Sequence, residues 1–225
     1  MPDYRGIDSL ARRPFLSSIA RCVLGASAVA LPLPTEAIFK GGNIQGDDWM
    51  ESLRGRHRTV FDVSAHRDGK PLTQAKNFLD AWATAFHVST SEVNLVVGVH
   101  GDALPVLVDD VIWAKYRIAE EYSVHIAADG GLPGNPFTES HAYEGRLIAR
   151  DQSVEALQRR GAIFVICNNT IRGAAQRLAA KQKVQPPELE ATLHAHLLPG
   201  VKTVPAMVVA LAQLQEHGLT YVKIA

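Results

Sequence analysis

The chain has 225 residues, of which 47% are hydrophobic and 20% are charged. This balance is typical of one globular domain with a hydrophobic core, and it excludes a disordered tail or a fibre. Lysine and arginine together number 23, as do aspartate and glutamate, so the formal net charge is zero. A neutral chain lacks the positive charge with which proteins bind nucleic acid non-specifically, and we therefore expect no nucleic-acid partner.

The first 37 residues have the pattern of an export signal. Arg12 and Arg13 precede a moderately hydrophobic stretch at 22–33, which is followed by proline and small residues. This order is typical of a secretory signal, and Arg-Arg-x-Phe-Leu resembles the twin-arginine signal. The stretch is shorter than the roughly 20 residues that span a bilayer. We expect residues 1–37 to be a signal peptide, residues 38–56 to be a flexible lead-in, and the mature chain to reach the periplasm without a membrane span.

Removal of the signal peptide changes the cysteine content. Ala30 and Ala37 each end a candidate cleavage site, and cleavage after Ala37 removes Cys22. Cys167 is then the only cysteine of the mature chain. An unpaired cysteine in an exported protein indicates an intermolecular bridge or a reactive thiol.

From residue 58 onward, hydrophobic runs alternate with segments of helical periodicity. Short runs rich in Val, Ile and Phe are typical of strands that are buried on both faces. They predict five strands, at residues 58–65, 93–100, 162–167, 201–204 and 221–224. Hydrophobic residues that recur every three or four positions predict helices at about 71–86, 109–120, 152–160, 170–182, 187–194 and 205–217. The alternation predicts a three-layer α/β/α sandwich with a mainly parallel five-stranded sheet, flavodoxin-like in general form, as a single domain over 57–225.

Residues 122–150 interrupt this alternation. The segment 130–136 is rich in glycine and proline, and long irregular loops in compact domains are often lids or binding loops. Phe137, His141 and Tyr143 could close over a site, pack locally or contact another subunit. The sequence leaves these three roles open.

Three reactive side chains follow predicted strands. His66 comes just after the first strand, His100 ends the second, and Cys167 ends the third. Ligands in open α/β sheets bind beyond the carboxyl ends of the strands, so all three are candidate catalytic residues. The helix predicted after Cys167 would direct free N–H groups and the positive end of its dipole at the sulfur, an environment that stabilises a thiolate. The residues expected to bind a ligand at this helix start are Asn168, Asn169, Thr170 and Arg172.

Each of these side chains also has a purely structural interpretation. Cysteine is among the most buried residue types, so Cys167 could simply end a core strand. His66 lies in a turn-like string, and His100 precedes Gly101, where a loop histidine is ordinary. Elsewhere, Asp109 and Asp110 are adjacent and do not face the same way on a helix, which favours one helix cap and one surface charge.

Three segments of the carboxyl half resemble one known family. They are residues 164–170 (FVICNNT), 198–206 (LPGVKTVPA) and 214–224 (LQEHGLTYVKI). With them the chain resembles the DsrE/DsrF-like family over roughly residues 57–225. The resemblance implies a compact α/β/α fold, a homo-oligomer, and a Cys167 that carries sulfur as a persulfide from a donor to an acceptor protein or small thiol. The chain departs from the sulfur-relay members of that family in its export signal and its 122–150 insertion.

Two classes of function stay open. In the first, Cys167 accepts and donates a sulfane sulfur, with His66 or His100 adjusting its protonation and with no cofactor. In the second, the thiolate and two imidazoles converge in a periplasmic metal- or haem-binding module. An oligomeric module without catalysis, in which Cys167 is inert, is a third interpretation. No Gly-x-Gly-x-x-Gly follows the first strand and no Walker loop is present, so neither nucleotide-binding motif is available.

Overall fold

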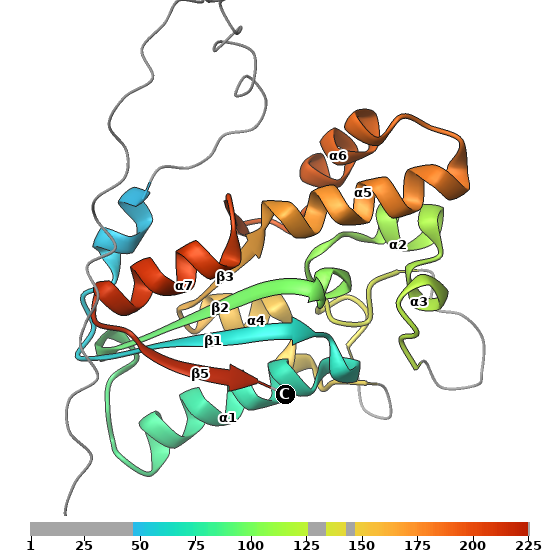
Figure 1. Cartoon of the computed structure of the whole chain (residues 1–225). Helices are drawn as coiled ribbons and strands as arrows, with labels where there is room; N and C mark the ends of the chain where they lie inside the picture. Colours follow the sequence, from blue (N-terminus) through green and yellow to red (C-terminus); the bar gives the residue numbers. More distant parts are fainter. Residues whose placement is uncertain (1–46, 126–133, 143–146, 225) are drawn as a thin grey trace, which may run out of the picture. The chain divides into compact units, whose positions relative to one another are not determined.

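The computed structural model describes residues 47–125, 134–142 and 147–224 (Figure 1). Five strands form one sheet, parallel throughout, in the order β4-β3-β2-β1-β5. The strands are β1 (His57–Ala65), β2 (Val93–Asp102), β3 (Ala162–Cys167), β4 (Lys202–Val204) and β5 (Thr220–Ile224). Each predicted strand is confirmed, with ends that differ by at most two residues. The predicted signal peptide, 1–37, lies outside the described residues.

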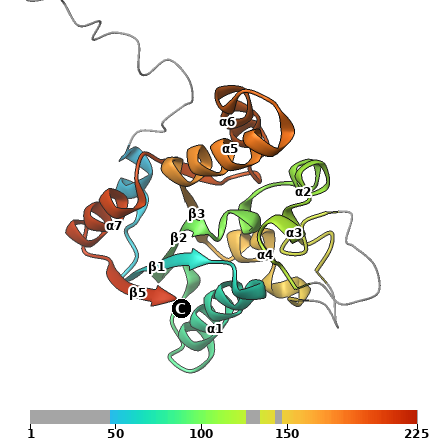
Figure 2. The ribbon, with the colours of Figure 1, turned by 45° about the vertical axis from the view of Figure 1, so that its right-hand side comes forward.

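Helices cover both faces of the sheet, which confirms the three-layer α/β/α sandwich (Figure 2). The helices are α1 (Lys70–Thr84), α2 (Asp110–Tyr116), α3 (Ile118–Glu121), α4 (Val154–Arg159), α5 (Asn168–Gln182), α6 (Pro186–Ala195) and α7 (Met207–Glu216). Side chains of α1, α4 and α5 share one hydrophobic core with Phe61 and Val97 of the sheet. Side chains of α7 share a second core with Val60 and Val96. These two residues directly precede Phe61 and Val97 on β1 and β2, so their side chains point to the opposite face of the sheet.

The connections that leave β3 and β4 go to opposite faces of the sheet. The helix after β3 is α5, which packs in the first core, whereas the helix after β4 is α7, which packs in the second. Neighbouring strands whose connections diverge leave a crevice between their carboxyl ends, and this is where open α/β sheets bind ligands. Strand order therefore points to the ends of β3 and β4.

Part of the predicted lead-in belongs to the fold. Residues 38–46 lie outside the described residues, but Asp47–Ser52 form a 3₁₀ helix, η1, which covers the same face as α7. Trp49, Met50 and Leu53 are buried in the second core. The prediction of a flexible segment up to residue 56 is therefore wrong for its second half, because these three side chains bury hydrophobic area that would otherwise face water.

The described part of the 122–150 insertion packs onto the domain. Phe137 is fully buried against Trp113, with ring centroids 6.0 Å apart. Asn135 is also fully buried, and its side-chain amide donates to the Val108 carbonyl at 2.7 Å. His141 contacts Asp110 at 3.0 Å. Tyr143 lies outside the described residues. For Phe137 and His141, local packing is thus the role that the structure supports.

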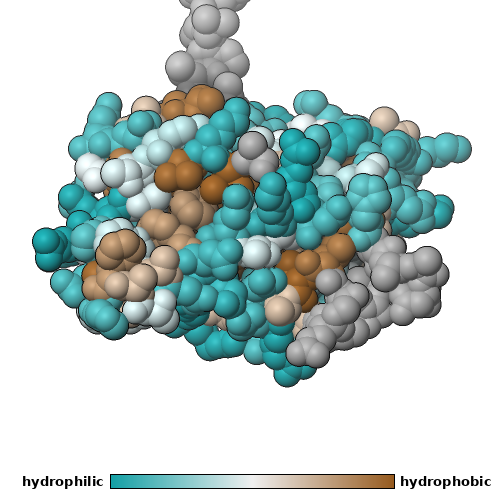
Figure 3. All heavy atoms as spheres, turned by 90° about the horizontal axis from the view of Figure 1, so that it is seen from below, coloured by the Kyte–Doolittle hydropathy of each residue, from teal (hydrophilic) through white to brown (hydrophobic). Residues whose placement is uncertain are grey.

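Some large hydrophobic side chains are exposed on the surface. The face formed by α1 is mostly hydrophilic, with hydrophobic residues in separate groups (Figure 3). The most exposed large ones are Val208 on α7, at 77% exposed, and Phe86 just after α1, at 65%. Among the described residues, no helix is long and apolar enough to cross a membrane.

Candidate functional site

A cavity of about 410 Å³ lies at the carboxyl ends of β2, β3 and β4. It is bounded by the end of β2, the first turns of α5 and α7, and one side chain from the end of α3. The lining residues are His100, Gly101, Asp102, Tyr122, Cys167, Asn169, Thr170, Gly173, Ala174, Arg177, Ala206, Met207 and Val208. The cavity therefore occupies the crevice that the strand order indicates.

Cys167 is 5% exposed and lies where two helices begin. It is the last residue of β3 and the N-cap of α5, and its Sγ accepts a hydrogen bond from the backbone N–H of Met207, the first residue of α7, at 3.3 Å. Gly98 on β2 leaves room for the Met207 side chain, because a Cβ there would lie 2.8 Å from its sulfur. Helix N-termini and N–H donors are the groups that stabilise a thiolate.

His100 lines the same cavity and is held by a buried carboxylate. Its Nε2 lies 2.7 Å from Oδ1 of Asp62, which is 8% exposed in the middle of β1. The other carboxylate oxygen accepts from the Tyr221 hydroxyl of β5, also at 2.7 Å. With Nε2 donating to Asp62, Nδ1 is the nitrogen of His100 that can take up a proton. Hydrogen bonding to Asp62, with burial in support, raises the pKa of Tyr221 above its usual 10.0.

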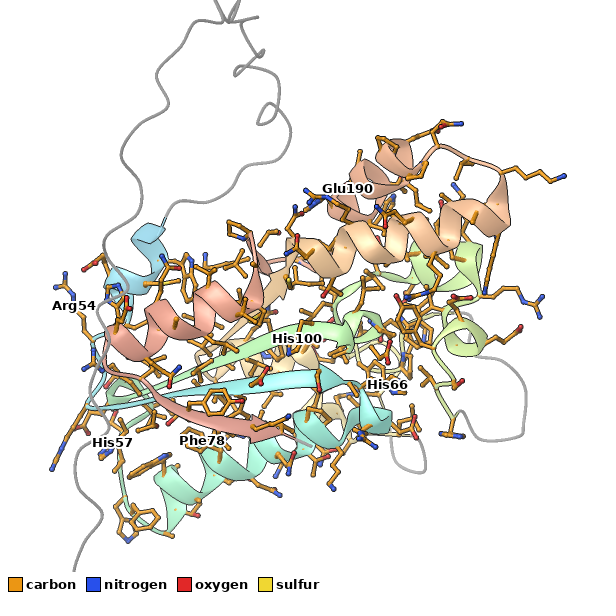
Figure 4. The ribbon with its side chains drawn as sticks, in the orientation of Figure 1. Arg54, His57, His66, Phe78, His100 and Glu190 are labelled. Carbon is orange, nitrogen blue, oxygen red and sulfur yellow. The ribbon has the colours of Figure 1, made fainter. Side chains whose placement is uncertain are left out.

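The structure does not bring His66 to the cavity. Its Nε2 lies 3.0 Å from the Tyr122 carbonyl, and its Nδ1 accepts from the Asp68 N–H at 3.1 Å. Both ring nitrogens are thus engaged, and the ring is 8% exposed. Figure 4 shows His66 beyond the end of β1, apart from His100. His66 joins the segment after β1 to the end of α3, which is a structural role.

The four predicted ligand-binding residues divide into two pairs. Asn169 and Thr170 line the cavity, and Thr170 Oγ1 accepts from the Gly101 N–H at 2.9 Å. Asn168 instead accepts from His194 of α6 at 2.7 Å. Arg172 is also directed at α6, where its Nε lies 3.6 Å from Glu190. Neither Asn168 nor Arg172 lines the cavity, because their positions on α5 face α6.

Five polar side chains of the site were not predicted from the sequence: Asp62, Asp102, Tyr122, Arg177 and Tyr221. Asp62 carried a usable signal, since a carboxylate within a strand that is buried on both faces needs a partner. Arg177 follows the cavity-lining Gly173 by one helical turn on α5. Tyr122 lies in the irregular segment after α3, where no periodicity indicates which way a side chain points.

The metal-binding interpretation required His66, His100 and Cys167 to converge. Only His100 and Cys167 meet at the cavity. Within 47–125, 134–142 and 147–224, no group of three His, Cys, Asp or Glu side chains is arranged to hold a metal ion. The donor set that this alternative needs is thus not assembled by the described residues.

Comparison with known proteins finds similar solved structures but no family. No protein-family model matches the chain, and no curated protein matches it. A solved structure that is similar is that of a protein of unknown function, MTH1491, from Methanobacterium thermoautotrophicum. It has a TM-score of 0.42 and 17% sequence identity, and the match covers 75% of this chain and 99% of that one. At this level of similarity the neighbour carries no argument about function.

Proposed function

We propose that this protein is a periplasmic, DsrE-like sulfur carrier in which Cys167 accepts a sulfane sulfur as a persulfide and passes it on. The observation that carries the proposal is the position of Cys167 Sγ, at the wall of a 410 Å³ cavity where the N-termini of α5 and α7 meet. The Met207 N–H donates to this sulfur. Attack on a sulfane sulfur requires the thiolate, which is the nucleophilic form of a cysteine.

His100 supplies proton transfer in this proposal. It lines the same cavity, and Asp62 holds its Nε2 so that Nδ1 is the nitrogen without a hydrogen bond to the described residues. A base at that position takes the thiol proton before sulfur is accepted and returns a proton to the acceptor when sulfur leaves. Asp62 stabilises the imidazolium that forms in between, in the manner of a carboxylate that orients a catalytic histidine.

The test is sulfur loading of the purified chain with polysulfide, read by mass spectrometry. Each added sulfur contributes about 32 Da that reductant removes. Cys167→Ser should abolish this mass while the far-ultraviolet circular dichroism stays unchanged. With the uncleaved chain used throughout, Cys22→Ser is the matched control, because Cys22 is the only other cysteine of the sequence, and it should load normally. Loading that persists in Cys167→Ser contradicts the proposal.

Export and self-association belong to the same proposal. They are supported by the pattern of residues 1–37 and by the family resemblance. Native mass spectrometry of protein recovered from the periplasm should show a chain that begins after Ala37 and a homo-oligomer of it. A full-length monomer in the cytoplasm would contradict both.

A further inference from the structure

The cavity beside Cys167 is bounded by two helix N-termini that lack side-chain caps. Neither Cys167, the N-cap of α5, nor Ala206, the N-cap of α7, caps its own helix through its side chain, and Cys167 Sγ accepts from the first N–H of α7. The first N–H groups of a helix have no partner within the helix and bear a partial positive charge. Asn169 and Thr170 of α5 and Val208 of α7 line the cavity from these two first turns. Two helices thus begin at one small space, which favours an anion there.

A guanidinium lines the same cavity. Arg177 of α5 pairs with Glu121 through Nε at 3.1 Å, and Lys181 pairs with the other oxygen of that carboxylate. One carboxylate is therefore shared by two cations, which leaves one positive charge in excess. Asp102 also lines the cavity and is exposed to solvent, where its charge is more strongly screened.

Tyr122 provides an independent indication of a ligand. It lines the cavity, is 7% exposed, and its hydroxyl has no hydrogen-bond partner among the described residues. Burial raises the pKa of Tyr122 to about 12, although the charge of Arg177, 4.8 Å from the ring centroid, acts in the opposite direction. The phenol therefore keeps its proton at neutral pH and is available as a donor. A buried donor without a partner is unfavourable, and a ligand with acceptor atoms would relieve this cost.

Gly173 is the third observation. It lies inside α5, where glycine destabilises a helix relative to alanine, and it lines the cavity. Packing does not explain the choice, because a Cβ built at Gly173 would meet no atom within 4 Å. Glycine at this position therefore destabilises the helix, and no atom of the described chain lies close enough to require it. What the missing side chain does provide is room in the cavity.

We propose that this cavity binds a small anion, held by the first turns of α5 and α7, Arg177 and Tyr122, with Gly173 leaving the space that it fills. If the proposed sulfur chemistry holds, this anion is the sulfur donor, and its class is a sulfane-sulfur oxyanion such as thiosulfate. The Cys167 thiolate attacks the outer sulfur, a bond forms between the two sulfurs, and the bond to the central sulfur breaks. Its electron pair leaves with sulfite, so thiolate and thiosulfate give persulfide and sulfite without a further oxidant or reductant.

The experiment is calorimetric titration of the Cys167→Ala chain with thiosulfate, so that binding is measured without sulfur transfer. We expect one thiosulfate per chain. Arg177→Met should weaken binding at least tenfold. Arg172→Met is the matched control, since Arg172 lies on the same helix but pairs with Glu190 and does not line the cavity, and it should bind as the parent chain does. Gly173→Ala should raise the melting temperature while it weakens binding, a combination that a purely structural glycine would not give.

The outcomes separate this inference from the proposed function. Absence of thiosulfate binding, or binding that Arg177→Met and Gly173→Ala leave unchanged, overturns the anion site even if Cys167 takes up sulfur from polysulfide. Binding with the expected losses supports the site. If the wild-type chain binds thiosulfate in this way and yet neither thiosulfate nor polysulfide adds sulfur to Cys167, the anion site stands and the sulfur-carrier proposal fails.

Discussion

Nε2 of His100 and Oδ1 of Asp62 lie 2.7 Å apart across two neighbouring strands. The carboxylate is 8% exposed, and a buried carboxylate is stable only when it is paired or hydrogen-bonded. Asp62 receives one bond from His100 and a second from Tyr221, on the strand at its other side. His100 is therefore presented to the cavity in a fixed orientation from a sheet, which is more rigid than a loop.

Removal of the imidazole should slow sulfur loading without preventing it. For His100→Gln we expect the loading rate at neutral pH to fall by about 100-fold, the lower range of general acid–base contributions. Stopped-flow loading with polysulfide measures the rate. Asp62→Asn should also slow loading, because a neutral amide cannot stabilise an imidazolium. Tyr221→Phe keeps the Asp62–His100 bond and should have the smallest effect of the three. Equal rates in His100→Gln and the wild type would exclude proton transfer by His100.

The Tyr221 phenol should titrate above its usual pKa of 10.0, because ionisation would place a phenolate beside the Asp62 carboxylate and break their hydrogen bond. Ultraviolet difference titration against Tyr221→Phe isolates this residue from the other tyrosines. In Asp62→Asn the charge is removed, and the pKa should return toward 10.0. A Tyr221 pKa that is the same in both backgrounds would contradict the hydrogen bond.

Stability should decrease on mild acidification because of His194. Burial holds the pKa of this imidazole below its usual 6.5, against the opposing charge of Glu190, while Arg172 lowers it further. As the pH falls below 6.5, His194 becomes protonated in the unfolded chain but stays neutral in the folded chain. The free energy of unfolding therefore falls until the pH reaches the pKa of His194 in the folded chain. Urea denaturation at about pH 7.5 and about pH 5.5 measures the difference.

His194→Gln is the variant for this measurement, since glutamine can still donate to Asn168 but does not titrate. It should reduce the loss of stability between the two pH values. The control is His217→Gln, whose side chain is exposed at the end of α7. An equal loss in all three chains would mean that other groups carry the pH dependence.

Asn135 should be the most sensitive position of the described insertion. It is fully buried and makes one bond through its oxygen and three through its nitrogen. Its partners are the Phe137 N–H and the carbonyls of Pro105, Val106 and Val108. Asn135→Ala removes the bonds to the Phe137 N–H and to the Val106 and Val108 carbonyls, while the Pro105 carbonyl keeps the Trp113 indole as donor; each buried group left without a partner costs about 1–3 kcal/mol. We expect a loss of about 3 kcal/mol or more in urea denaturation.

The control for Asn135 is Glu139→Gln in the same segment. Glu139 pairs with Arg159 at an exposed position, and exposed ion pairs contribute at most about 1 kcal/mol. If both variants lose stability equally, the buried amide does not anchor the insertion.

The strands and the position of Cys167 could be predicted from the sequence because both depend on local patterns. The run from Ala162 to Cys167 is continuously apolar, and the helix signal follows at once. The composition of the cavity could not be predicted, because it depends on strand order and on the direction of helical side chains. Arg172 and Arg177 look alike in the sequence, yet one faces α6 and the other faces the cavity.

The position of β5 beside β1 affects the order in which the contacts of the site form during folding. Tyr221 and Asp62 are 159 residues apart along the chain, and their contact requires the last strand to dock against the first. Contacts between such distant residues form late, since closing a long loop costs entropy before any bond compensates for it. A folding intermediate that has already joined β1 to β2 can thus hold His100 against Asp62 while that carboxylate still lacks its second donor. Newly made chains should pair β1 with β2 before Asp62 acquires its second hydrogen bond.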